Sequence, residues 1–480
     1  MPETIDNFFN TKLVNYASYD NLRKIASCID GLKNASRKVM YTVLEKNIKD
    51  NVKVLQLANK SAEFADYLHG DLSGVCITLG QDFSGTNNVP LLKKSGNFGT
   101  RSIHEASAPR YIFAKGSELF FKIYSKEDND ILDVQYFEGS KIEPRFYVPA
   151  LPMLLINGSD GVSMGFAQKI MPRDFKDVKK YLIDRLNGKK GNAKLLEPSV
   201  NNFNGTIIKD LETPNKYLVS GIVRKIKDTE FLIEEIPYTY DLAEYLKVLN
   251  ELEESKFIQK YTDESDGENC LKFRVYISRA NQEVCNIKAG DKNPDLSILL
   301  NKLKLIKPIT ENYTSIDENL KIFQASSIIE LFERYYDVKL KYIEKRKKFL
   351  LERYIYNNNI NNSKKRFIEL YIKGKLKINN VKKEELIEEL EKLKFLKIDD
   401  SYDYLLKMPI YSLTFEKIEE LKQAIEELEN KIIDLKNSTA EQIWLNDLKK
   451  LWYTSNILYY KNEYINGFEL WSFQIFQKNK

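Results

Sequence analysis

Three zones with different hydrophobic patterns follow one another along the chain. The first, over about residues 1–150, mixes short helical stretches at 19–46 and 61–77 with turns such as GQDFSGTNN and KSGNFGT. Apolar positions at helical spacing, interrupted by glycine-containing turns, are typical of a compact domain that combines helices with short strands. We therefore predict an α+β domain over residues 1–150.

The second zone, over about residues 151–324, alternates strand-like runs with turns. The runs are rich in β-branched and aromatic residues, and one helical stretch at 241–257 interrupts them. They read NGTIIKD, KYLVSGIVRKI, EFLIEEIPY and LKFRVYIS. The chain contains no G-x-x-x-x-G-K-[ST] motif, so nucleotide binding through a P-loop is not expected. This zone predicts a second, mixed α/β domain.

The third zone, over about residues 325–455, is helical. Apolar positions recur there in alternating steps of three and four, which makes one apolar seam on each of two long helices. The seams contain Ile328, Leu331, Tyr335, Val338, Tyr342, Lys345 and Phe349, and Ile418, Leu421, Ile425, Leu428, Ile432 and Leu435. An Asn- and Lys-rich insertion lies between them, with a shorter helix at 382–396. The pattern suggests an antiparallel pair of helices with a small domain at about 361–414, although an ordinary helical bundle fits the same periodicity. The aromatic-rich tail, 456–480, is unassigned.

Composition narrows the class of protein. The 480 residues are 43% hydrophobic and 30% charged, and no run of 18 apolar residues occurs, so no membrane span is expected. The first residues do not form a secretory signal. The 4 cysteines are scattered, which fits a reducing cytoplasm, and only 2 histidines are present, which argues against a multi-histidine metal site.

Charge gives a local signal rather than a global one. The net charge of +5 permits nucleic-acid binding without requiring it. Between residues 91 and 115, however, five cations stand against one acidic residue, Glu105. A solvated basic loop and a DNA-binding patch both fit this cluster. Its cations are Lys93, Lys94, Arg101, Arg110 and Lys115.

Acidic pairs offer a weaker signal for a metal ion. Asp128 with Asp130, and Asp399 with Asp400, have the oxygen ligands that Mg²⁺ prefers. Both pairs lie in polar, turn-like sequence. We therefore expect solvated loops at these positions.

Chemistry distinguishes Tyr111 among the 29 tyrosines. A tyrosine that attacks a phosphodiester must lose its proton, although the pKa of a free phenol is about 10. Nearby cations favour that loss and stabilise the charge that develops at phosphorus. Tyr111 directly follows Arg110 at the end of the basic cluster, next to glycine-containing loops. It is the favoured candidate nucleophile, with a buried structural tyrosine as the alternative.

Six ordered motifs extend this interpretation over about residues 30–437. They are IDGLKNASRKVMY, YLHGDLSG, QDFSG with SGNFGTRSIHEASAPRYIFA, LPMLLINGSDGVSMGFA, EEIPY and LLKMPIYSLTFEKIEELK. In order and spacing the chain resembles the breakage-reunion subunits of type IIA DNA topoisomerases. The RYIFA continuation and the short length look most like the medium subunits of T-even bacteriophage enzymes.

The resemblance implies a fold and a role for particular residues. The three zones would be a winged-helix breakage domain, a tower domain, and a coiled coil with an exit gate. Tyr111 would form a 5′-phosphotyrosine link with DNA, and Arg110 would stabilise the scissile phosphate. DNA contacts would come from Lys33, Arg37, Lys38, His69 and Val162, the last of which aligns with an isoleucine that wedges between base pairs. Because Val162 is a methylene smaller than isoleucine, we expect it to bend DNA less.

The resemblance also implies partners. The E-G-D motif of the family's metal-binding domain is not found here, no D-x-D triplet stands in a plausible setting for a metal site, and the family's ATPase domain is missing. A partner subunit of the ATPase/Toprim type is therefore expected to hold Mg²⁺ and ATP, and no metal site is expected in this chain. Double-stranded DNA and a second copy of the chain would complete the complex, in the cytoplasm of a bacterial host if the chain is phage-encoded. Two alternatives stay open. A gyrase or topoisomerase IV A subunit of cellular type would carry a long C-terminal DNA-wrapping domain, whereas a non-enzymatic DNA-binding coiled-coil protein would form no covalent adduct.

Overall fold

The computed structural model describes residues 4–288, 290–291, 294–378 and 381–458. The chain forms two compact units, one from the described parts of Met1–Lys339 and Leu445–Lys480, the other from Leu340–Trp444. The boundary predicted near residue 150 lies inside the first unit, and the predicted gate region, 361–414, lies inside the second. Most of the unassigned tail, from residue 459 on, lies outside the described residues.

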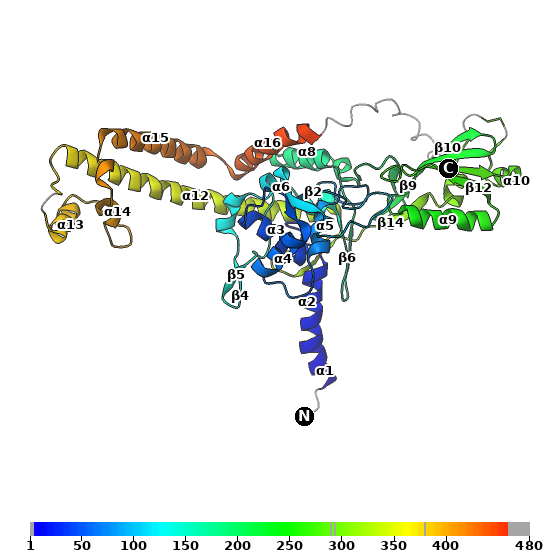
Figure 1. Ribbon diagram of the computed structural model, residues 1–480, viewed down its shortest axis with the longest axis horizontal. Helices are drawn as coiled ribbons and strands as arrows, with labels where there is room; N and C mark the ends of the chain where they lie inside the picture. The colour runs from blue at the N-terminus through cyan, green and yellow to red at the C-terminus, as the bar shows by residue number, and fades with distance from the viewer. Residues whose placement is uncertain (1–3, 289, 292–293, 379–380, 459–480) are drawn as a thin grey trace. The chain divides into compact units, whose positions relative to one another are not determined.

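Helices dominate the beginning of the first unit (Figure 1). They are α1 (Ile5–Phe8), the π-helical turn η1 (Phe9–Leu13), α2 (Val14–Lys24), α3 (Asn34–Glu45), α4 (Val54–Phe64) and α5 (Ser73–Gly80). Each of the two helical stretches predicted at 19–46 and 61–77 is therefore divided. Gly31 explains the first interruption, because its φ is +70° and a Cβ there would lie 2.5 Å from the backbone nitrogen of Leu154. The chain must leave the helix here to pack closely against the segment 152–157.

A small antiparallel sheet follows, with the strand order β1-β3-β2. Its strands are β1 (Val52–Lys53), β2 (Leu92–Ser95) and β3 (Phe113–Gly116). Ala114 in β3 pairs with Val52 on one side and Lys94 on the other. One face of the sheet is packed in the core, where Leu92 and Ala114 are fully buried. The opposite face carries Phe113 and Lys115, which alternate with Ala114 along β3.

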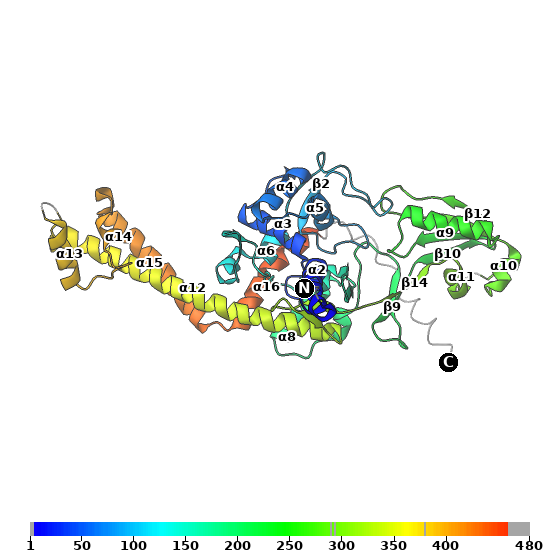
Figure 2. The same ribbon diagram turned by 90° about the horizontal axis from the view of Figure 1, so that it is seen from below.

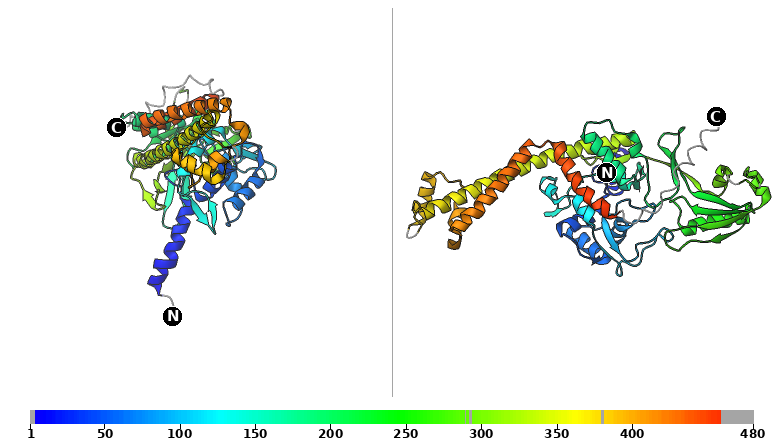
Figure 3. Two further views of the ribbon diagram at one scale, coloured as in Figure 1. Left: turned by 90° about the vertical axis from the view of Figure 1, so that its left-hand side faces the viewer. Right: turned by 90° about the horizontal axis from the view of Figure 1, so that it is seen from above.

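Two hairpins and several short helices complete this half of the first unit. The hairpins are β4 (Gln135–Phe137) with β5 (Ser140–Ile142), and β6 (Ser159–Val162) with β7 (Ala167–Ile170). In Figure 1 both hairpins lie on the side of the unit from which α2 extends, and Figure 3 shows the same helix from a second direction. The helices are α6 (Glu118–Ile123), η2 (Lys126–Ile131), α7 (Met153–Asn157), α8 (Phe175–Leu186) and η3 (Ala193–Leu196).

The remainder of the first unit contains two further sheets. A four-stranded sheet has the order β10-β11-β13-β12 and a three-stranded sheet the order β14-β9-β8. Helix α9 (Leu242–Glu254) packs on the first of these through Tyr245 and Leu249. All the predicted strand runs contain strands, and the helix predicted at 241–257 is confirmed. The bounds are β8 (Thr206–Lys209), β9 (Lys216–Ser220), β10 (Ile222–Lys227), β11 (Glu230–Glu235), β12 (Ile258–Asp263), β13 (Phe273–Ile277), α10 (Arg279–Val284), α11 (Ser297–Lys302), β14 (Ile306–Thr310), β15 (Thr314–Ile316) and β16 (Ile322–Gln324).

Two long helices form the second unit. They are α12 (Ile328–Ile372) and α15 (Phe415–Asn437), which run antiparallel (Figure 2). Two contacts show this direction: Lys347 donates to the carbonyl of Ser438 at 2.6 Å, and Ile368 packs near Ile418. Between them lie α13 (Lys383–Lys392), α14 (Asp403–Leu406) and η4 (Ile410–Ser412), and α16 (Ala440–Leu458) follows. On α15 the seam residues Ile418, Leu421, Ile425 and Ile432 are buried, as the heptad spacing predicts. In the part of the chain that the structure describes, no helix combines the length and hydrophobicity needed to cross a bilayer.

Candidate active site and nucleic-acid interface

Tyr111 lies in an exposed turn immediately before β3. Its side chain is 66% exposed, and its backbone N–H donates to the carbonyl of Ala108 at 2.9 Å. The first two N–H groups of α4 hold this turn, since Val54 donates to the carbonyl of Ile112 at 2.9 Å and Leu55 to that of Pro109 at 3.2 Å. The phenol is therefore presented to solvent from a backbone fixed on both sides.

Arg110 supplies a cation at this position. Its guanidinium carbon lies 4.8 Å from the centroid of the Tyr111 ring. No ion pair connects Arg110 to an acidic side chain among the described residues, and the side chain is exposed. The turn thus combines an exposed phenol, the candidate nucleophile, with an uncompensated positive charge, which is the arrangement that attack on a phosphodiester requires.

The loop before Tyr111 is tied by its own side chains. Asn97 accepts from the backbone N–H of Gly99 at 2.8 Å, and Gln81 donates to the carbonyl of Phe98 at 2.9 Å. Gly99 has a φ of +89°, and a Cβ at this residue would lie 2.4 Å from the carbonyl oxygen of His104. The GNFG and QDF sequences therefore build a tight loop that only glycine permits at this point.

Two members of the predicted basic cluster do not face solvent freely. Arg101 is 2% exposed and donates to the carbonyl of Pro237 at 2.9 Å and to that of Tyr240. Lys94 pairs with Asp82 at 2.5 Å. Arg101 is therefore a positioning residue that joins the loop to the EEIPY segment. The uncompensated cations of the cluster, among the described residues, are Lys93, Arg110 and Lys115.

Arg37 and Lys38, two of the predicted DNA contacts, are buried and ion-paired in the structure, and their contact with DNA stays a prediction. Arg37 donates to the fully buried carboxylate of Asp30 at 2.6 and 3.1 Å. Lys38 pairs with buried Glu143 at 2.9 Å and also donates to the carbonyl of Ala65 at 2.5 Å. Both residues are buried in the first unit, so their charges hold α3 in place.

The other three predicted contacts, Lys33, His69 and Val162, gather around α2. The Nε2 of His69 lies within hydrogen-bond distance of the hydroxyl of Tyr19, in the middle of α2. Lys33 donates to the carbonyl of Asp160 in β6 at 2.6 Å, and burial lowers the pKa of its ammonium group. Val162, at the end of β6, is 72% exposed.

Helix α2 also holds the hairpin tip next to Val162. The backbone N–H of Met164 donates to the carboxylate of Asp20 at 3.0 Å, and the hydroxyl of Ser163 donates to the side-chain oxygen of Asn21 at 2.5 Å. Sequence reasoning missed Tyr19, Asp20 and Asn21, because their partners lie far away along the chain. In the sequence, the one indication of this contact was that an acidic residue and an amide residue, Asp20 and Asn21, are adjacent near the end of a polar helix.

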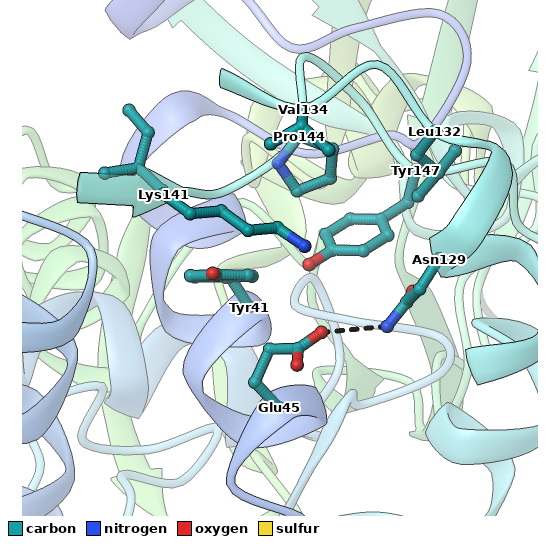
Figure 4. Close-up of a pocket in the computed structure, with 9 residues that line it drawn as sticks. Tyr41, Glu45, Asn129, Leu132, Val134, Lys141, Pro144 and Tyr147 are labelled. Carbon is teal, nitrogen blue, oxygen red and sulfur yellow. Dashed lines mark hydrogen bonds between the residues drawn. The ribbon is translucent and has the colours of Figure 1, made fainter. Parts of the chain in front are cut away.

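A small pocket lies elsewhere in the first unit, between α3 and the β4–β5 hairpin (Figure 4). Glu45 accepts from the side-chain amide of Asn129 at 2.8 Å, and the Tyr147 hydroxyl faces Lys141 in the view shown. Burial raises the pKa of Tyr147 well above its ordinary value. The residues around α2, namely Lys33, His69 and Val162 with Tyr19, Asp20 and Asn21, are here called the α2 group. The pocket shares no residue with the Tyr111 turn or the α2 group, so it is not part of the candidate site.

The described residues offer no group of three or more His, Cys, Asp or Glu side chains placed to hold a metal ion. The acidic pairs of the sequence behave differently from each other. Asp128 is buried and accepts from the ammonium group of Lys339 at 3.2 Å, so the expectation of a solvated side chain is wrong for Asp128, whereas Asp130 is exposed. Asp399 and Asp400 lie in an exposed turn, both with positive φ.

Comparison with known proteins gives consistent matches over nearly the whole chain. A family model, described as that of the A subunit of DNA gyrase/topoisomerase IV, matches residues 23–449. The mitochondrial DNA topoisomerase 2 of Dictyostelium discoideum is 30% identical over 465 residues, which cover 93% of this chain and 35% of the relative. The human DNA topoisomerase 2-alpha is 30% identical over 493 residues, covering 93% and 31%. The chain thus spans about a third of the length of these curated relatives.

A solved structure shares the fold. It is described as the "topoisomerase II DNA-binding, cleavage and re-ligation domain" of Plasmodium falciparum, and it superimposes with a TM-score of 0.82 at 30% identity. The match covers 94% of this chain and 64% of that one.

Proposed function

The chain belongs to the family of DNA gyrase/topoisomerase IV A subunits, and we propose that it breaks and rejoins double-stranded DNA in a type IIA topoisomerase, with Tyr111 as the nucleophile. One observation carries this proposal. Tyr111 is an exposed phenol beside an uncompensated guanidinium, within the segment that matches the family. The similarity to a cleavage and re-ligation domain supports the same reaction class.

The proposed reaction is a reversible transfer of a phosphoryl group. The Tyr111 oxygen loses its proton and attacks phosphorus, the bond from phosphorus to the 3′-oxygen breaks, and that oxygen takes up a proton to become a 3′-hydroxyl. The product is a 5′-phosphotyrosine ester, so the number of phosphoester bonds is unchanged. In the reverse step the 3′-hydroxyl displaces the tyrosine. Arg110 stabilises the extra negative charge on the phosphate in both directions.

The α2 group supplies a second contact with DNA in this proposal. The exposed apolar tip at Val162 would enter between base pairs and bend the duplex. Lys33 and His69 flank the same hairpin and helix, where they would contact the backbone. Hydrogen bonds that the side-chain oxygens of Asp20 and Asn21 accept hold the tip, so a bend could be imposed without first ordering the hairpin.

Mg²⁺ and ATP are proposed to be bound by a partner subunit. The acidic side chains of this chain's described residues do not cluster in a way that fits a metal site. A partner of the ATPase/Toprim type would supply both the metal and the nucleotide, and strand passage would depend on its ATP hydrolysis.

Two copies of the chain are proposed to act together, one Tyr111 for each DNA strand. In the second unit, Tyr411 is 83% exposed and Phe415 is also exposed, at the end of the helix pair. Large apolar side chains held in solvent are typical of protein contacts. We propose that this region forms the exit gate, a contact between two copies that opens to release the transported duplex.

The finer assignment is to a separate medium subunit of the T-even bacteriophage kind, acting in the bacterial cytoplasm. A cellular gyrase or topoisomerase IV A subunit is the alternative, since the family model carries that description. Purification of the native complex distinguishes the two by the size and number of the proteins that accompany the chain.

The central test is the formation of a covalent adduct. The full chain, a Toprim-type partner, Mg²⁺ and end-labelled DNA are mixed and denatured, and labelled protein is measured. Wild type forms adducts, whereas Tyr111→Phe reduces them by more than about 10⁴-fold because the nucleophile is lost, with DNA binding retained. Tyr136→Phe is the matched control, since Tyr136 is also 71% exposed. Adducts that persist in Tyr111→Phe would defeat the assignment, and no adduct with wild type would favour the non-enzymatic alternative.

A further inference from the structure

The open face of the β1-β3-β2 sheet carries three lysines that no hydrogen bond or ion pair among the described residues uses. Lys93 in β2 is the direct cross-strand partner of Lys115 in β3, so both side chains lie on the same face. On that face the next position along β3 is Phe113, which lies between Ser95 and Lys53. Lys53 and Lys93 are exposed and Lys115 is half-buried. Lys53, Lys93 and Lys115 are here called the lysine face.

This arrangement is unfavourable in the protein alone. Like charges placed directly opposite each other in an antiparallel pair destabilise it. Within the described part of the chain, no acidic side chain pairs with any of the three lysines, whereas the neighbouring Lys94 has its partner in Asp82. A polyanion laid across the sheet would relieve the repulsion that the protein leaves uncompensated.

The lysine face continues directly from the nucleophile. β3 begins two residues after Tyr111, and its residues at alternate positions, Phe113 and Lys115, point to the open face. Successive positions on one face of a strand are about 7 Å apart. A backbone that passes Tyr111 and follows β3 would therefore meet Lys115 and Lys93 a short distance beyond the broken bond.

We propose that the lysine face binds the phosphate backbone of the duplex beside the cleaved bond. This inference rests on the proposed function, and it adds an interaction surface to it. Lysine ammonium groups bind phosphate as point charges and carry no base preference, so the contribution is independent of DNA sequence. It leaves the chemical step to Tyr111 and Arg110.

The test is the salt dependence of DNA binding by the full chain. Lys93→Gln with Lys115→Gln removes two proposed phosphate contacts, and the slope of log K against log salt falls by about 0.9 for each. The loss of affinity between about 50 and 200 mM salt consequently shrinks by roughly tenfold relative to wild type. The charge-matched control is Lys373→Gln with Lys375→Gln, two exposed lysines of the second unit, which leaves the slope unchanged.

Two further measurements complete the test. The thermal midpoint of Lys93→Gln/Lys115→Gln is expected to equal or exceed that of wild type, because a like-charge pair has been removed. At limiting DNA, adduct formation by the double variant is expected to fall, because the DNA concentration for half-maximal adduct rises.

Each outcome distinguishes the lysine face from the proposed function. A wild-type slope in the double variant, with wild-type adducts, overturns the inference and leaves the proposed function intact. Normal DNA binding combined with failure to assemble with the Toprim-type partner overturns it too, since the face would then serve an acidic protein surface. A reduced slope in a chain that never forms adducts supports the face while the proposed function fails.

Discussion

Two basic regions of the first unit contrast in how their charge is compensated. On α3, Arg37 and Lys38 are buried and face the carboxylates of Asp30 and Glu143. In the turn before β3, Arg110 is exposed, its guanidinium carbon lies 4.8 Å from the centroid of the Tyr111 ring, and no ion pair to it occurs among the described residues. Both regions belong to motifs that resemble DNA-contacting segments, yet only the second offers an uncompensated cation. A basic residue in a motif therefore marks either a fold constraint or a binding site, and burial decides which.

The Asp30 carboxylate shows how Arg37 of the first region is held in the fold. Besides the two bonds from Arg37, it accepts from the backbone N–H of Leu32 and from that of Tyr147, each at 3.0 Å. The carbonyl of the same residue accepts from the Tyr124 hydroxyl at 2.8 Å. One residue thus joins α3, α6 and the segment before α7. Removal of its cation would leave a buried carboxylate with no opposite charge.

The largest expected effect follows from this. Arg37→Ala should lower the free energy of unfolding by about 3–5 kcal/mol, because a buried charge is left uncompensated. Urea denaturation followed by circular dichroism measures the change. Arg110→Ala is the comparison variant, and it should stay within about 0.5 kcal/mol of wild type because the side chain is exposed. Equal losses of stability in the two variants would erase the contrast between the regions.

Arg110→Ala, which should hardly change stability, is expected to have a large effect in the cleavage assay. Arg110→Ala should reduce the rate of adduct formation by about 10²–10³-fold through lost stabilisation of the phosphate. Non-covalent DNA binding should weaken by less than about tenfold, because one phosphate contact is lost. Arg145→Ala, which removes another exposed arginine of the same unit, serves as the control. Equal losses of cleavage and binding would make Arg110 a simple phosphate contact.

Local patterns in the sequence were sufficient for much of the fold. The β-branched runs predicted β9, β10, β11 and β13, and heptad spacing predicted the buried seam of α15. These features depend on residues close together along the chain. The division of the first helical stretch at Gly31 was missed, because the close approach of the Leu154 backbone is a tertiary contact.

Residues of the candidate site could be predicted where the chemistry of their own side chains identified them. Residues whose role depends on a distant ion-pair or hydrogen-bond partner could not. Tyr111 with Arg110 could be selected as a nucleophile beside a cation, and the structure leaves both exposed. Arg101 looked equivalent to Arg110 along the sequence, but its partners at Pro237 and Tyr240 lie in another part of the unit. Asp128 was misread for the same reason, since its cation is Lys339. Sequence shows the charges without showing which of them are already paired.

The smallest expected effect concerns His104, whose imidazole is close enough to the buried Arg101 to feel its charge. Burial, and to a lesser extent the nearby charge of Arg101, lowers the pKa of its imidazole below the ordinary value of about 6.5. The unfolded chain therefore takes up this proton first as the pH falls. Stability attributable to neutral His104 is present above pH about 6.5 and is lost as the pH falls through that value towards the lower folded pKa.

His104→Gln should accordingly remove a small part of the decline in urea midpoint below pH about 6.5 and change little at pH 8. The only other histidine, His69, provides the control, because His69→Gln leaves the contribution of His104 in place. An NMR titration of the His104 ring measures the pKa directly. A value at or above that of a free histidine would mean that neither burial nor the charge of Arg101 lowers the pKa of this ring, and the decline in stability would then have another source.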